Sequence, residues 1–165
     1  MFRMVRINTE VLELFLYFWE AVNDKEKVGE AFLADIATRK EMSVLFSEEF
    51  DGESVRRVLS SIANREILSD KTKAEGRFWN NNMWMLEDLS LTREMLAPVK
   101  QLNGEQFAGN LSGDLLIYFI PGHLDTYYKT QGELYINFFK LMFDYGTGEV
   151  MIDGLPLVDF IKSVI

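Results

Sequence analysis

The single histidine of the chain is the first residue whose chemistry could serve catalysis. His123 follows Pro121-Gly122 and precedes Asp125 by two positions. If Pro121-Gly122 forms a two-residue hairpin turn, the side chains of Tyr118, His123, Asp125 and Tyr127 share one face of a sheet. Asp125 would then orient the imidazole as a general base, and the tyrosines would position a substrate or lend a hydroxyl.

Other features of the sequence argue against an enzyme. The opposite face of the same two runs is the more apolar one, which is also the pattern of a sheet whose other side is solvated. The nucleophile motif Gly-x-Ser-x-Gly and the phosphate-binding motifs Gly-x-x-x-x-Gly-Lys and Gly-x-Gly-x-x-Gly do not occur. We therefore predict no catalytic residue and keep a small enzyme with a His123/Asp125 acid-base pair as an alternative.

The composition also restricts metal sites and cofactors. The chain has no cysteine, and one histidine with scattered carboxylates lacks the ligand spacing of a zinc site. The segment 144–149 lacks the acid at every second position that a calcium loop uses. We predict neither a metal nor a cofactor, and because cysteine is absent we expect a cytoplasmic protein without a disulfide framework.

A basic and aromatic segment between residues 56 and 84 is the most unusual surface feature. It combines cations and tryptophans with three consecutive asparagines at 80–82. Such residues could bind a nucleic acid, a glycan or a peptide backbone. The alternative is that the tryptophans anchor the core and the bases are solvated charges. The candidate binding residues are Arg56, Arg57, Lys71, Lys73, Arg77, Trp79, Asn81 and Trp84.

The charge distribution indicates the kind of partner. The net charge is −9, and only the region 54–77 carries more bases than acids. This balance disfavours nucleic acid, because affinity for nucleic acid comes mainly from neutralised phosphates. We predict another protein with a basic surface as the partner, with a homodimer as a further option. No apolar window of about 18 residues is free of charges, so we expect no membrane association.

Hydrophobic periodicity predicts the elements that position these residues. Helices are expected from about residue 8 to 23, from 25 to 39 with Phe32 buried, and after Asp51-Gly52. Residues 78–86 resemble a strand, whereas 89–96 fit either a short helix ending before Pro98 or an edge strand. Four aromatic and β-branched runs follow, separated by turn residues, at 114–120, 123–129, 133–144 and 148–153.

Together these elements predict a single α+β domain over residues 1–165. The helical part covers about 8–65, the mainly sheet part about 78–153, and a terminal helix about 155–165. We expect the N-terminal helices to pack on a C-terminal antiparallel meander. The absence of catalytic motifs favours a non-catalytic intracellular interaction protein of the adaptor, inhibitor or immunity type, with an acidic and aromatic-rich surface. A nucleic-acid-binding regulator that uses residues 56–84 is the other alternative.

Overall fold

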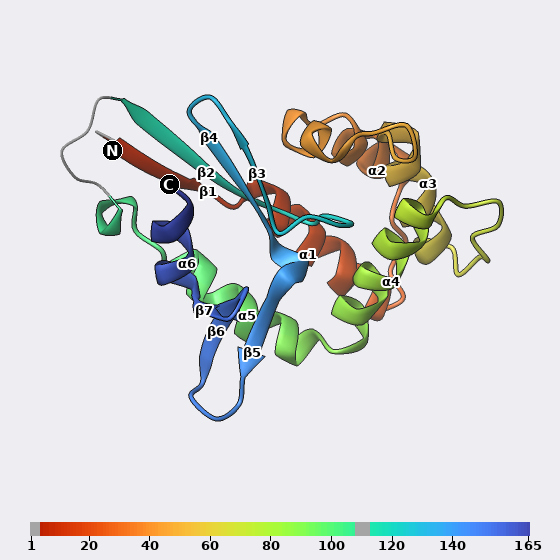
Figure 1. Cartoon of the computed structure of the whole chain (residues 1–165). Helices are drawn as coiled ribbons and strands as arrows, with labels where there is room; N and C mark the ends of the chain where they lie inside the picture. The colour runs from red at the N-terminus through yellow and green to blue at the C-terminus, as the bar shows by residue number, and fades with distance from the viewer. Residues whose placement is uncertain (1–3, 108–112) are drawn as a thin grey trace. The chain divides into compact units, whose positions relative to one another are not determined.

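The computed structural model describes residues 4–107 and 113–165 and has an α+β fold. N-terminal helices are combined with a mixed four-stranded sheet, a small antiparallel three-stranded sheet and a C-terminal helix (Figure 1). The chain divides into two compact units. The helical unit comprises Glu10–Leu89 and Pro121–Leu124, and the sheet unit comprises the segment before Glu10, Ser90–Ile120 and Asp125–Ile165. The single-domain organisation stays a prediction.

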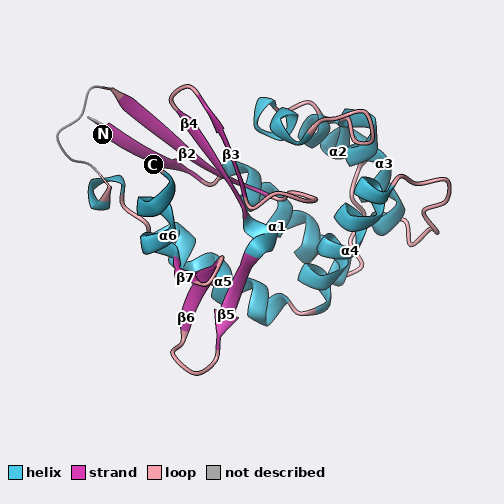
Figure 2. Cartoon of the chain, in the orientation of Figure 1, coloured by secondary structure: helices cyan, strands magenta, loops and turns pink. Residues whose placement is uncertain are grey.

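The helical unit is built from four α-helices and one short 3₁₀ helix (Figure 2). The first helix is confirmed and the third begins after Asp51-Gly52 as predicted, but the second is shorter than its predicted range. Lys25 has a positive φ of 61°, which ends the first helix, and the next helical residue is Glu30. The elements are α1 (Glu10–Asn23), α2 (Glu30–Ala37), η1 (Lys40–Leu45), α3 (Gly52–Ala63) and α4 (Lys73–Glu87).

Helix α1 forms the core of the helical unit. Its large side chains Phe15, Phe18 and Trp19 are fully buried. The indole Nε1 of Trp19 donates a hydrogen bond of 2.9 Å to Oδ1 of Asn82 on α4, and Asn82 is itself fully buried. This bond satisfies two polar groups that burial would otherwise penalise.

Phe32 of α2 is half-buried, so the predicted burial of this side chain is only partial. Its ring packs edge-on against Tyr17 of α1, with ring centroids 5.2 Å apart. The fully buried residues of α2 are Leu33 and Ile36, because the interior face of this helix is rotated by one position. Phe32 of α2 therefore contacts α1 as expected, but through the ring of Tyr17 and from a partly exposed position.

The expected strand at 78–86 is a helix. Helix α4 begins after a capping box in which Thr72 Oγ1 accepts from the Glu75 amide and the Glu75 carboxylate accepts from the Thr72 amide. Phe78, Asn82 and Met85 are its buried residues in this stretch, at the spacing of one helical face. The strand prediction for this stretch is therefore wrong, because the periodicity of its buried residues is helical.

The sheet unit contains a four-stranded sheet in the order β1-β2-β4-β3. Its strands are β1 (Met4–Asn8), β2 (Asp114–Ile120), β3 (Tyr127–Thr130) and β4 (Glu133–Asn137). β2 runs parallel to both β1 and β4, and only β3 and β4 form an antiparallel hairpin. The predicted antiparallel meander is therefore wrong for β2, which has no pairing across Pro121-Gly122.

The composition of β2 explains this topology. Leu115, Ile117 and Phe119 are buried, as predicted, but Tyr118 and Ile120 on the other face are buried as well. A strand that is apolar on both faces is typical of the interior of a parallel sheet. The parallel partner on one side is β1, which the sequence analysis did not predict.

The remaining elements of the sheet unit follow β4. The predicted run 133–144 is broken by η3 (Phe138–Lys140), where Asn137 Oδ1 accepts from the Phe139 amide. The second sheet consists of β5 (Leu141–Asp144), β6 (Glu149–Ile152) and β7 (Leu155–Pro156), all antiparallel. The chain ends in α6 (Leu157–Val164), within the range predicted for the terminal helix.

The segment 89–101 is the helix α5 (Leu89–Gln101). The helical alternative is therefore correct, but the expected end before Pro98 is wrong because the helix includes this proline. The short helix η2 (Gly104–Gln106) follows. Within the described residues, no helix is both long and apolar enough to cross a bilayer.

Candidate functional site

The candidate catalytic residues were grouped on the assumption of a hairpin turn at Pro121-Gly122. The observed strand pairing has no such hairpin, because β2 pairs with β4. Tyr118 pairs with Tyr135 of β4, and the two rings stack with centroids 4.8 Å apart. Asp125 lies outside the strands, and its carbonyl oxygen accepts from Asn137 Nδ2 at 2.9 Å. Burial, followed by the charge of Asp125, raises the pKa of Tyr128. Tyr127 belongs to β3 and contacts the ring of Phe160.

His123 is a buried member of the helical unit. Its Nε2 lies 2.9 Å from the carbonyl oxygen of Leu45, and its ring centroid lies 4.5 Å from that of Phe50. A carbonyl oxygen only accepts, so Nε2 is the donor in this contact. Nδ1 is buried and has no hydrogen-bond partner within the described part of the chain. Among the described residues no carboxylate bonds to this ring, so the orienting role proposed for Asp125 has no geometric support here.

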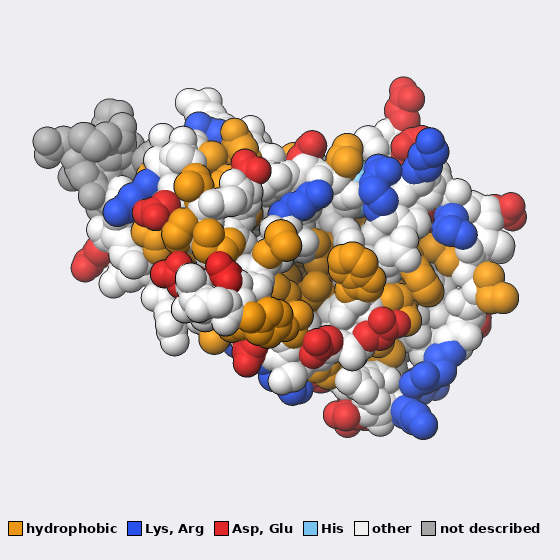
Figure 3. Space-filling view, turned by 60° about the horizontal axis from the view of Figure 1, so that its bottom comes forward, with side chains coloured by type: hydrophobic (Ala, Val, Ile, Leu, Met, Phe, Trp, Pro, Cys, Tyr) orange, Lys and Arg blue, Asp and Glu red, His pale blue; other side chains and the backbone are white. Residues whose placement is uncertain are grey.

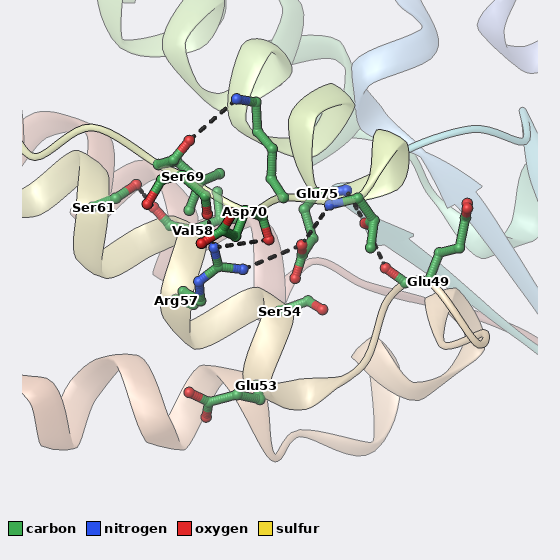
Figure 4. Close-up of polar contacts among 12 residues, drawn as sticks. Glu49, Glu53, Ser54, Arg57, Val58, Ser61, Ser69, Asp70 and Glu75 are labelled. Carbon is green, nitrogen blue, oxygen red and sulfur yellow. Dashed lines mark hydrogen bonds and ion pairs between the residues drawn. The ribbon is translucent and has the colours of Figure 1, made fainter.

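Two of the candidate binding arginines form ion pairs within the helical unit. Arg56 binds Glu53, and it also reaches Glu30 at 3.2 Å. Its hydrogen bond to Glu53 lowers the pKa of that carboxyl. Arg57 pairs with the buried carboxylate of Glu75 at 3.3 Å, as Figure 4 shows. Both guanidinium groups are thus engaged by carboxylates of this chain.

Two further candidates bind the short segment Pro121–Leu124. Arg77 Nε donates to the carbonyl oxygen of His123 at 2.9 Å, and Asn81 Nδ2 donates to that of Gly122 at 3.3 Å. Backbone carbonyls at a buried position need donors, and these side chains supply them. Arg77 and Asn81 therefore have a structural role in the helical unit.

An apolar cavity of about 560 Å³ lies within the helical unit. Its wall is formed by Val22 at the end of α1, Ile62 of α3, the loop 65–71, and Trp79 and Met83 of α4. Binding pockets are usually concave, mostly apolar and of about 300–1,000 Å³, with a few polar groups that orient the ligand. This cavity, which we call the groove, has that character. It contains two of the predicted residues, Lys71 and Trp79.

The loop 65–71 is held in place by hydrogen bonds from its neighbours. Arg57 of α3 points into this loop and donates to the carbonyl oxygens of Ser69 and Asp70 (Figure 4). Lys71 Nζ donates to the Leu68 carbonyl at 3.1 Å, and the Glu66 amide donates to the Ser61 carbonyl at 2.8 Å. One wall of the groove is therefore already shaped before any ligand binds.

One strongly exposed apolar side chain lines the groove. Ile67 belongs to the lining and is 93% exposed. Trp84 is 71% exposed and lies one helical turn beyond Asn80, which also lines the groove. Figure 3 shows apolar side chains at the surface among charged ones. Ile67 is therefore apolar surface of the groove that the free protein leaves in water.

The polar groups at the groove are mainly donors. Arg65 and Lys71 line it, and within the described chain neither has a carboxylate at ion-pair distance. Lys73, another predicted residue, is exposed at the start of α4. The indole Nε1 of Trp79 is buried and meets no acceptor among residues 4–107 and 113–165. Sequence reasoning missed Ile67, Gly76 and Met83, although a glycine within a helical pattern was a readable signal.

A substitution at Gly76 tests whether α4 is helical where it lines the groove. It lies inside α4, and a Cβ there would have Cδ and Cε of Lys71 as its nearest neighbours at 3.7 Å, an ordinary contact. Glycine in a helix interior costs about 0.5–1 kcal/mol relative to alanine. We expect Gly76→Ala to raise the free energy of unfolding by about this amount in chemical denaturation. A loss of stability would contradict the helical conformation at this position.

Among the described residues, no group of three or more His, Asp and Glu side chains is arranged to hold a metal ion. The groove is the feature of the helical unit best suited to binding. Its walls are mostly apolar, and the side chains of Arg65 and Lys71 add hydrogen-bond donors to the lining. No family model, curated protein or solved structure matches this chain, so any functional assignment depends on this geometry.

Proposed function

We propose that this chain is a non-catalytic interaction protein whose groove binds a segment of a partner protein. The observation that carries this proposal is an apolar cavity of about 560 Å³ whose lining includes Ile67, a side chain that is 93% exposed. Contiguous apolar surface that a protein leaves exposed often marks an interaction site or a ligand-binding groove. Burying this apolar surface would release water and stabilise a complex.

The residue types at the groove support a protein ligand. Tryptophan, methionine and arginine are enriched at the centres of protein interfaces, and energetic hot spots concentrate there in pockets. The groove combines Trp79, Met83 and Arg65. A side chain of the partner inserted between them would be surrounded by apolar atoms on several sides.

The same contacts weaken the case for nucleic acid. Arg56 and Arg57 are paired with carboxylates, and Arg77 binds a backbone carbonyl. Nucleic-acid affinity requires cations free to neutralise phosphates, and the net charge of the chain is −9. Trp79 lines an apolar cavity, whereas bases stack on exposed aromatic faces.

Affinity purification from the native cell tests the proposal. Tagged wild-type chain is compared with Gly76→Leu, which places a bulky side chain at the groove, and with Gly76→Ala as the matched control. We expect a stoichiometric protein partner with the wild type and the control, and at least tenfold less of it with Gly76→Leu. Equal recovery with all three variants would exclude the groove. Nucleic acid that survives a moderate-salt wash would favour the regulator instead.

A further inference from the structure

We infer that the occupant of the groove is an amphipathic α-helix of a partner protein, with acidic residues flanking its apolar face. This inference rests on the proposed function and specifies the chemistry of the ligand. It follows from three features of the groove: the charge at its rim, the scarcity of strand pairing around it, and the exposed apolar side chain of Ile67 in its lining.

The charge at the rim selects acidic residues. Arg65 and Lys71 lie at the groove, and each donates a hydrogen bond to a backbone carbonyl, Arg65 to Val22 and Lys71 to Leu68. Neither has a carboxylate partner among the described residues, so their charges are not neutralised within this part of the chain. Glu66 is the acidic residue of the lining, and it adjoins Arg65 in the loop. Charge complementarity at an interface fixes register and excludes wrong partners. The basic partner expected from the overall charge is therefore not what this contact favours.

The apolar lining selects a helix over an extended segment. A helix satisfies its backbone hydrogen bonds internally, whereas an extended peptide must pair its backbone with the protein or leave it unpaired. Strand pairing in the described part of the helical unit is limited to one isolated bridge, Ser47 with Phe50. A helix that presents side chains at positions i, i+3, i+4 and i+7 would fill the groove at no cost in backbone hydrogen bonds.

The exposed rim favours a macromolecule over a small amphiphile. A ligand confined to the cavity would leave most of Ile67 in water, because this lining residue is 93% exposed. A helix that lies along the groove would cover Ile67 while one of its side chains enters the cavity. The interface would then bury the apolar surface that the free protein exposes.

Peptide display tests the inference. The first library holds amphipathic helical peptides of about 16 residues, long enough to form a helix. Their apolar face is randomised among Leu, Ile, Met, Phe and Trp, and their polar face among Asp, Glu, Lys, Arg and Gln. Selection uses the full chain, with counter-selection against Gly76→Leu. We expect the selected peptides to be enriched in Asp and Glu beside the apolar positions.

A charge reversal supplies the second measurement. Lys71→Glu is expected to weaken the selected acidic peptides about tenfold in fluorescence anisotropy. Lys27→Glu is the matched control, because Lys27 is exposed and does not line the groove. We expect this control to change affinity less than twofold. Both residues are exposed, which keeps the test usable if Gly76→Leu does not fold. Because Lys71 Nζ also donates to the Leu68 carbonyl, circular dichroism checks that Lys71→Glu keeps the wild-type fold.

The outcomes separate the inference from the proposed function. A second, unbiased library of linear peptides is selected in parallel. If it yields groove-dependent binders that are extended or basic, the proposed function stands and the inference is overturned. If acidic and basic helical peptides bind equally well, the charge argument fails and the inference is overturned. If neither library yields a binder that Gly76→Leu or Lys71→Glu weakens, both are overturned.

Discussion

Replacing Trp19 with alanine is expected to lower the free energy of unfolding of the helical unit by about 5 kcal/mol. Trp→Ala changes in a core cost about 3–5 kcal/mol through lost burial and the cavity left behind. Trp19 is fully buried, and its Nε1 donates to the buried Oδ1 of Asn82. The substitution removes this donor, which adds the cost of an unpaired buried acceptor. Chemical denaturation monitored by circular dichroism at 222 nm measures the change.

Two control variants separate the contributions. Trp19→Phe keeps most of the ring but loses the donor, so we expect a cost of about 1–3 kcal/mol. Glu13→Ala changes an exposed residue of the same helix and is expected to change stability by less than about 0.5 kcal/mol. If Trp19→Ala costs no more than Glu13→Ala, the packing of α1 against α4 described above is wrong.

Gly104→Ala is expected to destabilise the sheet unit by about 3 kcal/mol or more. A Cβ at Gly104 would lie on the carbonyl oxygen of Val5 and only 2.7 Å from its carbonyl carbon. Both are backbone atoms of β1, so the strand or the turn at η2 would have to move. Overpacking in a core commonly costs about 1–3 kcal/mol, and a displaced backbone costs more. Thermal denaturation of the variant measures this effect.

Gly113 provides the matched control for Gly104. A Cβ built at Gly113 has no heavy atom of the described residues within 4 Å, so alanine should be tolerated there. We expect Gly113→Ala to leave the melting temperature within about 2 °C of the wild type. If Gly104→Ala is tolerated equally well, β1 does not lie against η2, and the placement of this strand at the edge of the sheet is contradicted.

The local patterns of the sequence predicted much of the fold. The periodicity of α1 and the Asp51 cap of α3 are properties of neighbouring residues, and both were readable. The β3–β4 turn was readable for the same reason, because Gly132 adopts the positive φ of 78° that the turn needs. Interactions within a few residues of each other are the ones that a single sequence reveals.

The topology of the sheet could not be predicted in this way. β1 has only five residues, and its partner β2 lies more than a hundred positions further along the chain. The parallel register depends on packing between these distant strands, and no turn specifies it. The two-residue turn expected at Pro121-Gly122 was a local inference that tertiary structure overrode, and the grouping of His123 with Asp125 depended on it.

The candidate site was predicted in part. Lys71 and Trp79 line the groove, whereas Arg56, Arg57, Arg77 and Asn81 are engaged in contacts within the helical unit. The difference lies in which acceptor each side chain meets after folding, which composition does not encode. The groove itself depends on the conformation of the loop 65–71, where Arg65 and Asp70 have positive φ values. Only the structure reveals such a loop.

The central claim is that a partner segment occupies the groove, and methyl NMR tests it most directly. In a chain labelled with ¹³C at its methionine methyl groups, Met83 reports on the groove. Met142 of the sheet unit is 70% exposed and serves as the internal reference. On titration with the partner recovered by affinity purification, the Met83 signal should shift with saturation while that of Met142 stays in place. A saturating shift of Met142 with Met83 unchanged would contradict the claim.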